Sequence, residues 1–204
     1  HMAYSAGISA KGFKAARAWL GHISGGLATS AVVACGLFAT VSGSSIATAA
    51  TVSKISIPEL LKAGYSKRLA GACVATGGTL GVLIPPSTIM VLYSIATETP
   101  IPELFIAGVI PGILTMLIYA IGIRLMVKRD ASMSSLTVQP RVGYRERLKL
   151  TFSSWEILLI FIAVMGTLYT GIATASEAAG IGALVALGIA LYRGTSLKDI
   201  KSGL

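Results

Sequence analysis

Two short, oxygen-rich stretches interrupt the most apolar parts of this 204-residue sequence. The first, VSGSSIATAAT, places three serines and a glycine at residues 42–45. The second, TGGTLGVLIPPS, combines three glycines with two consecutive prolines at residues 76–87. Proline lacks a backbone donor, and glycine and serine favour turns over helix interiors. Both stretches therefore predict breaks in otherwise helical, apolar segments.

The residues at these breaks have the chemistry of an ion site. Where a helix ends near Gly77–Gly81, the carbonyl oxygens of residues 79–84 lose their helical partners. Together with the hydroxyls of Ser42, Ser44 and Ser45, these oxygens suit a hard monovalent cation such as sodium.

A helix that restarts after the prolines would point its N-terminal amides at the same place, which suits a carboxylate. Ser87 and Thr88 are therefore candidate substrate contacts. The alternative is that glycine and proline only permit a kink and close helix packing. Non-helical backbone inside a bilayer is tolerated only where protein covers it or a cavity adjoins it. Two such breaks together favour a binding site.

The composition places these breaks in a membrane. Hydrophobic residues make up 54% of the chain and charged residues 12%, against roughly 25% charged residues in ordinary soluble domains. Each charge-free gap can accommodate a spanning helix of roughly 20 residues. These gaps separate Arg17 from Lys54, Arg68 from Glu98, Glu103 from Arg124, and Glu156 from Glu177. The sequence predicts an all-α integral membrane protein.

Several other classes of protein are disfavoured. The net charge of +9 comes from basic residues that flank apolar segments, which argues against nucleic-acid binding. The phosphate-binding pattern Gly-x-x-x-x-Gly-Lys-Ser is absent from the sequence, which argues against ATP hydrolysis. An intramembrane serine hydrolase would need a base, and the apolar segments hold neither histidine nor aspartate. Cys35 and Cys73 are expected to be buried thiols, and Glu177 to cap a helix.

The elements that must position the breaks follow from charge and length. Residues 1–22 predict an interfacial amphipathic helix, with a plain cytoplasmic cap helix as the alternative. Residues 23–57 have two arms that are too short to cross and basic residues at both ends. They predict a re-entrant hairpin that opens to the cytoplasm, with residues 42–45 at its tip. One long tilted helix is the alternative.

The rest of the chain predicts further membrane helices. Residues 58–127 form a broken helix that crosses outward, an acidic external loop and a helix that returns. Residues 128–154 are expected to be a basic cytoplasmic linker, because residues 124–149 carry seven basic side chains against two acidic ones. Residues 155–204 then supply two more helices.

The combination of SGSS-x-A, GTLG-x-LIPPS and IPELFIAGVIPGIL resembles the large membrane subunit of tripartite ATP-independent periplasmic (TRAP) transporters, over almost the whole chain. The stretch GIATASEAA is similar to a family motif, with Ala175 in place of a proline. Members are about twice as long and are built from two inverted repeats. The resemblance implies that this sequence is an internal portion with one copy of the hairpin and broken helix, extending into the start of the second repeat.

The resemblance also implies a function. It indicates a sodium-driven elevator transporter of the bacterial inner membrane that imports organic acids, such as C4-dicarboxylates or sugar acids. A periplasmic binding protein would deliver the substrate, and a small four-helix membrane subunit would accompany the large one. The sodium ligands it implies are Ser42, Ser44, Ser45, Gly81, Ile84 and Pro86. A non-transporting membrane scaffold, whose breaks serve packing only, is the alternative.

Overall fold

The computed structural model describes residues 8–129 and 140–192, and the regular structure in these ranges is helical. This confirms the predicted all-α class for the described part of the chain. In chain order the helices are α2 (Ile8–Leu20), α3 (Gly26–Ser42), α4 (Ser45–Lys62), α5 (Lys67–Leu83), α6 (Thr88–Thr97), α7 (Ile101–Arg129), α9 (Tyr144–Phe152), α10 (Trp155–Tyr169) and α11 (Ala175–Tyr192).

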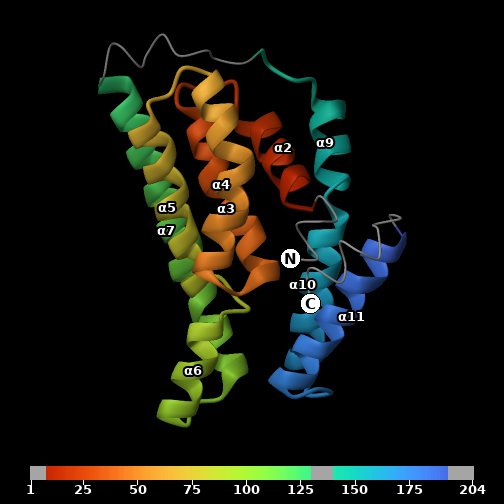
Figure 1. Cartoon of the computed structure of the whole chain (residues 1–204). Helices are drawn as coiled ribbons and strands as arrows, with labels where there is room; N and C mark the ends of the chain where they lie inside the picture. Colours follow the sequence, from red (N-terminus) through yellow and green to blue (C-terminus); the bar gives the residue numbers. More distant parts are fainter. Residues whose placement is uncertain (1–7, 130–139, 193–204) are drawn as a thin grey trace.

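Within the described ranges, three spans are long and apolar enough to cross a membrane: α5 with α6, α7, and α11. The pair α9–α10, bent by 46°, makes a fourth if it counts as one span. One end of the molecule, at the top of Figure 1, contains the α4–α5 turn, helix α9 and the C-terminal end of α7. The α6–α7 and α10–α11 turns lie at the other end, so the basic and acidic loops are separated as the charge pattern predicts.

Helices α3 and α4 form an antiparallel pair whose turn lies about halfway between the two ends of the molecule (Figure 1). Both helices pack against α5, and α3 also packs against α2 and α7. The core between them is built of small and medium apolar side chains, among them Val32, Phe38, Leu60 and Leu80. The cysteines at 35 and 73 are free and buried in the same core, as expected.

Helix α5 differs from the prediction. The three glycines at residues 77, 78 and 81 do not end it, and it continues to Leu83. They lie instead where neighbouring helices come closest. A Cβ at Gly77 would lie 2.9 Å from the Cys35 sulfur, and one at Gly78 would lie 2.8 Å from the Ala49 Cβ. Close packing outweighs the helix penalty of about 1 kcal/mol per glycine.

Helix α2 packs both against α3 and α4 and against α9 and α10. Its apolar side chains, including Phe13, are buried against other helices. At one end Lys11 pairs with Glu156 of α10, with Nζ 3.1 Å from Oε1. At the other end Arg17 Nη1 lies 2.8 Å from an oxygen of Glu59 on α4.

Two predicted boundaries differ from the helix ends. Helix α4 continues to Lys62, past the expected end of the hairpin at residue 57, and accommodates Pro58 inside it. The expected linker, residues 128–154, begins inside α7 and contains α9. Residues 130–139 of that linker lie outside the described part, as do residues 1–7 and 193–204.

Candidate functional site

The turn between α3 and α4 is tighter than the sequence indicates. Helix α3 includes Ser42, and α4 begins at Ser45, so Gly43 and Ser44 alone are non-helical. Gly43 has φ +62°, which glycine adopts without strain, and its amide donates to the Ala39 carbonyl. Ser44 is the N-cap of α4, and its hydroxyl accepts a hydrogen bond from the amide of residue 47 at 3.4 Å.

Ser42 faces across the turn. Its hydroxyl lies 2.7 Å from the Thr48 hydroxyl and donates to the Ser44 carbonyl at 3.3 Å. Thr48 is fully buried and belongs to this oxygen cluster, although sequence analysis did not select it. A spacing of six residues from Ser42 does not by itself predict this contact, because the contact depends on the turn that brings α4 back beside α3.

The break after α5 leaves carbonyl oxygens without helical partners. The residues four positions after Gly81 and Val82 are Pro85 and Pro86, which have no amide to donate. Leu80, in contrast, still accepts a bond from the Ile84 amide at 2.8 Å. The unpartnered carbonyls therefore begin at residue 81, and the prediction that they begin at residue 79 was wrong. The peptide bond between the two prolines is cis.

Gly81 brings the break into contact with the hairpin turn. A Cβ placed there would lie 2.9 Å from the Ser45 amide nitrogen and 3.1 Å from the Ser44 carbonyl oxygen. Three residues predicted to share a site, Ser44, Ser45 and Gly81, are thus brought together. Pro86 also reaches the turn, since its carbonyl oxygen lies 3.0 Å from the position of a Cβ on Gly43.

The start of α6 is bonded directly to the same turn. The backbone amide of Thr88 donates to the Gly43 carbonyl at 3.0 Å, and the Thr88 hydroxyl donates to the same oxygen at 2.9 Å. These bonds join positions 45 residues apart in the sequence. The two interruptions therefore form one structural unit.

Ser87 and Ile84 have different surroundings. Ser87 is the N-cap of α6 and is 1% exposed, yet its hydroxyl does not cap the helix and has no hydrogen-bond partner in the described part of the chain. A buried hydroxyl without a partner costs free energy, so this position favours a polar ligand. The Ile84 side chain is directed between α3 and α7, where it lies near Gly36 and Gly112.

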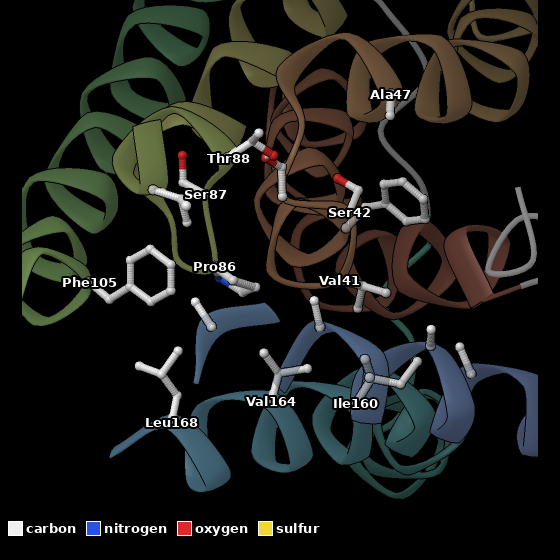
Figure 2. A pocket seen from close by; sticks show the side chains of 18 of the residues that line it. Val41, Ser42, Ala47, Pro86, Ser87, Thr88, Phe105, Ile160, Val164 and Leu168 are labelled. Carbon is white, nitrogen blue, oxygen red and sulfur yellow. Dashed lines mark hydrogen bonds between the residues drawn. The ribbon is translucent and has the colours of Figure 1, made fainter. Parts of the chain in front are cut away.

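A cavity of about 620 Å³ separates this unit from α10 and α11. Its volume lies within the usual range for small-molecule sites. Figure 2 shows Pro86 and Val41 between the hairpin turn and α10, whereas the hydroxyl oxygens of Ser42 and Ser87 point away from Ile160. The wall formed by α10 and α11 is apolar except for Ser176, and the other lining hydroxyls belong to the hairpin and the start of α6.

Glu177 lies at the start of α11. Its carboxylate accepts bonds at 2.8 Å from both the amide and the hydroxyl of Thr174, and the Glu177 amide donates to the same hydroxyl at 3.4 Å. This reciprocal arrangement is a capping box. The expected capping role is confirmed.

The comparisons with known proteins identify the family of the chain. The family model described as "Tripartite ATP-independent periplasmic transporter, DctM component" matches residues 1–204. A C4-dicarboxylate TRAP transporter large permease protein of Pseudomonas aeruginosa is 42% identical over 91% of the chain and 43% of its own length. Its counterpart in Vibrio cholerae is 43% identical over 92% of the chain and 41% of its own length.

A sialic acid TRAP transporter large permease protein of Vibrio cholerae is 32% identical, over 97% of the chain and 46% of its own length. The chain thus spans less than half the length of these relatives. They are named as transporter permeases and not as enzymes. The family match and the membrane-type helices lead to one conclusion: this chain belongs to the DctM family, the large permease component of TRAP transporters.

Proposed function

We propose that the chain forms part of a sodium-coupled secondary transporter that imports organic acids across the bacterial inner membrane. The observation that carries this proposal is the contact between two helix interruptions about halfway along the molecule. Broken helices at mid-membrane offer C-terminal carbonyls to cations and N-terminal amides to anions, which is how many secondary transporters bind ion and substrate.

The sodium ion would bind between the hairpin turn and the end of α5. Its candidate ligands are the backbone carbonyls of Ser44, Gly81 and Pro86 and the hydroxyls of Ser42, Ser44 and Thr48. Oxygen ligands suit hard cations, and the C-terminal end of a helix carries partial negative charge. Ser45 and Ile84 would help to shape this site through their backbone.

The substrate would occupy the cavity next to the start of α6. Its carboxylate would meet the N-terminal amides of α6 and the Ser87 hydroxyl, which has no partner among the described residues. Thr88 would contribute indirectly, since its own amide and hydroxyl are bonded to Gly43. The names of the relatives support two substrate classes, C4-dicarboxylates and sugar acids.

Transport would follow an elevator mechanism in which the unit of α3 to α6 slides against α10 and α11. The apolar wall of the cavity supports this, because apolar surfaces without interlocking hydrogen bonds can slide past each other. A periplasmic binding protein would deliver the substrate, and a small four-helix membrane subunit would complete the transporter. The remaining half of the longer relatives would supply a second hairpin and broken helix.

The test is uptake of labelled succinate or sialic acid by proteoliposomes containing the full-length permease, its small subunit and its binding protein. An inward sodium gradient should drive uptake, and an equal potassium gradient should not. Gly81→Ala should abolish uptake, whereas Gly71→Ala, with open space around it on the same helix, should retain it. Sodium-independent uptake would refute the sodium coupling. If neither substrate is taken up under any gradient while the complex is intact, transport of these two substrate classes is refuted.

A further inference from the structure

At the end of the molecule where α9 lies, α2 and α9 meet through one aromatic side chain. The Trp19 ring nitrogen donates to the Thr151 hydroxyl at 2.9 Å. The ring packs edge-on against Tyr144, with centroids 6.1 Å apart and planes at 84°. The Arg147 guanidinium lies 5.7 Å from the Trp19 ring centroid. We call this group of side chains the α2–α9 junction.

Arg147 is buried at the α2–α9 junction, and the described residues give it no counter-ion. The residue is 8% exposed, and its Nε donates to the Val142 carbonyl at 2.9 Å. Its Nη2 has no hydrogen-bond partner, and none of the ion pairs in the described part of the chain involves it. Leaving a buried charge without a counter-charge is strongly destabilising. An anion at this position would remove that cost.

A second nitrogen at the same end of the molecule is also unpartnered. The Nδ1 of His22 is buried and makes no hydrogen bond within residues 8–129 and 140–192. Burial, followed by the positive charges of Arg147 and Arg141, holds the pKa of His22 below its ordinary value. His22, which follows α2, therefore experiences a positive field that described acidic side chains do not cancel.

The outer face of α9 combines cations with exposed aromatic rings. Arg145, Lys149 and Phe152 are spaced four and three residues apart, so they share one helical face, and all three are exposed. Phe152 is 73% exposed, and Trp155, at the start of α10, is 47% exposed. Glu146 is the one acidic residue of this helix. Exposed aromatic rings beside basic side chains are typical of the boundary between lipid headgroups and acyl chains.

We propose that the α2–α9 junction binds the phosphate headgroup of an anionic phospholipid from the cytoplasmic leaflet, with Arg147 as its principal ligand. Arg145 and Lys149 would hold the lipid's negative charge, while Phe152 and Trp155 would contact the acyl chains. The cytoplasmic leaflet attracts basic segments near membrane helices, which fits this placement. The inference is independent of the sodium site.

The test compares the thermal unfolding of the full-length permease in a neutral detergent with three additions. These are phosphatidylglycerol, phosphatidylcholine with the same acyl chains, and inorganic phosphate. A ligand that binds only the folded state raises the Tm of the protein, and the rise grows with the ratio of ligand concentration to Kd. Phosphatidylglycerol should raise the Tm by several degrees more than phosphatidylcholine, and inorganic phosphate should have no effect. Equal shifts with both lipids, or the full shift with inorganic phosphate, would overturn the proposal.

Variants locate the site. Arg147→Gln should remove the difference between the two lipids. Lys128→Gln is the matched control, because Lys128 is an exposed cation on α7, whose C-terminal end lies across the molecule from α9 (Figure 1). If Arg147→Gln fails to fold, the double variant Arg145→Gln with Lys149→Gln decides, since both side chains are exposed. The proposal fails if this double variant keeps the same lipid preference as Lys128→Gln.

Discussion

The Gly43 carbonyl oxygen accepts two hydrogen bonds from Thr88, one from the backbone amide at 3.0 Å and one from the hydroxyl at 2.9 Å. These two hydrogen bonds connect the hairpin turn to the first residue of α6. Because Gly81 and Pro86 contact the same turn, the end of α5 is held there as well. The hairpin turn and both ends of the break must therefore move together.

Thr88→Val tests this link. Valine keeps the backbone bond and the side-chain volume but removes the hydroxyl, so we expect a loss of about 0.5–1.5 kcal/mol in the free energy of unfolding. Thr76→Val on α5 is the control, because the hydrogen bonds that its hydroxyl donates to described residues stay within its own helix. Denaturant unfolding of both variants measures the difference. Equal losses would show that the bond to Gly43 has no special weight.

Gly81→Ala tests the close approach of α5 to the turn. The new methyl group would lie 2.9 Å from the Ser45 amide nitrogen, so the turn must shift, at a cost of about 1–3 kcal/mol. Gly71→Ala has open space around it and should be neutral or stabilising by up to about 1 kcal/mol. Unfolding of the two variants in detergent distinguishes them. A Gly81→Ala protein as stable as Gly71→Ala would contradict the packing described here.

Lys11→Met tests the ion pair between α2 and α10. The Glu156 side chain is 1% exposed and that of Lys11 is 25% exposed, so the pair is largely shielded from solvent. Removing the cation leaves a buried carboxylate less compensated, and we expect a loss of about 1–3 kcal/mol. Lys14→Met, an exposed position on the same helix, should change the stability by less than about 0.5 kcal/mol. Thermal unfolding of both variants at constant salt provides the comparison.

His22 should make the stability sensitive to mild acid. Its pKa is lowered in the folded state, so the unfolded chain binds a proton first as the pH falls. The stability that neutral His22 contributes is therefore lost as the pH falls from the ordinary histidine pKa to the lowered value. We expect the Tm to fall less between pH 7.5 and pH 5.5 in His22→Asn than in the wild type. An identical fall in both proteins would exclude this role.

Sequence reasoning found both interruptions because their signals are local. The serines and Gly43 at the turn, and the two prolines of the break, lack the properties that helix interiors need, and the structure breaks near them. The glycines of α5 misled the prediction for a physical reason. Their low helix propensity is a local property, whereas the contacts they allow with α3 and α4 are tertiary.

The missed features depend on partners that are distant in the sequence. Thr48 is an ordinary residue within α4 until the turn places it 2.7 Å from Ser42. Helix α9 lies within a stretch dominated by charge, and the contact of Arg147 with Trp19 joins residues far apart in the chain. Local propensity and hydropathy do not report such contacts.

The central claim, a sodium site between the hairpin turn and the broken helix, is tested most directly by the Tm of the full-length permease in sodium against potassium. Ser44→Ala and Ser66→Ala form a matched pair, because both serines are N-caps and each accepts a bond from an amide three residues on. Sodium should raise the Tm of the wild type and Ser66→Ala equally, and Ser44→Ala should lose this effect. Equal Tm values in the two salts for the wild type, or a full sodium effect in Ser44→Ala, would contradict the account.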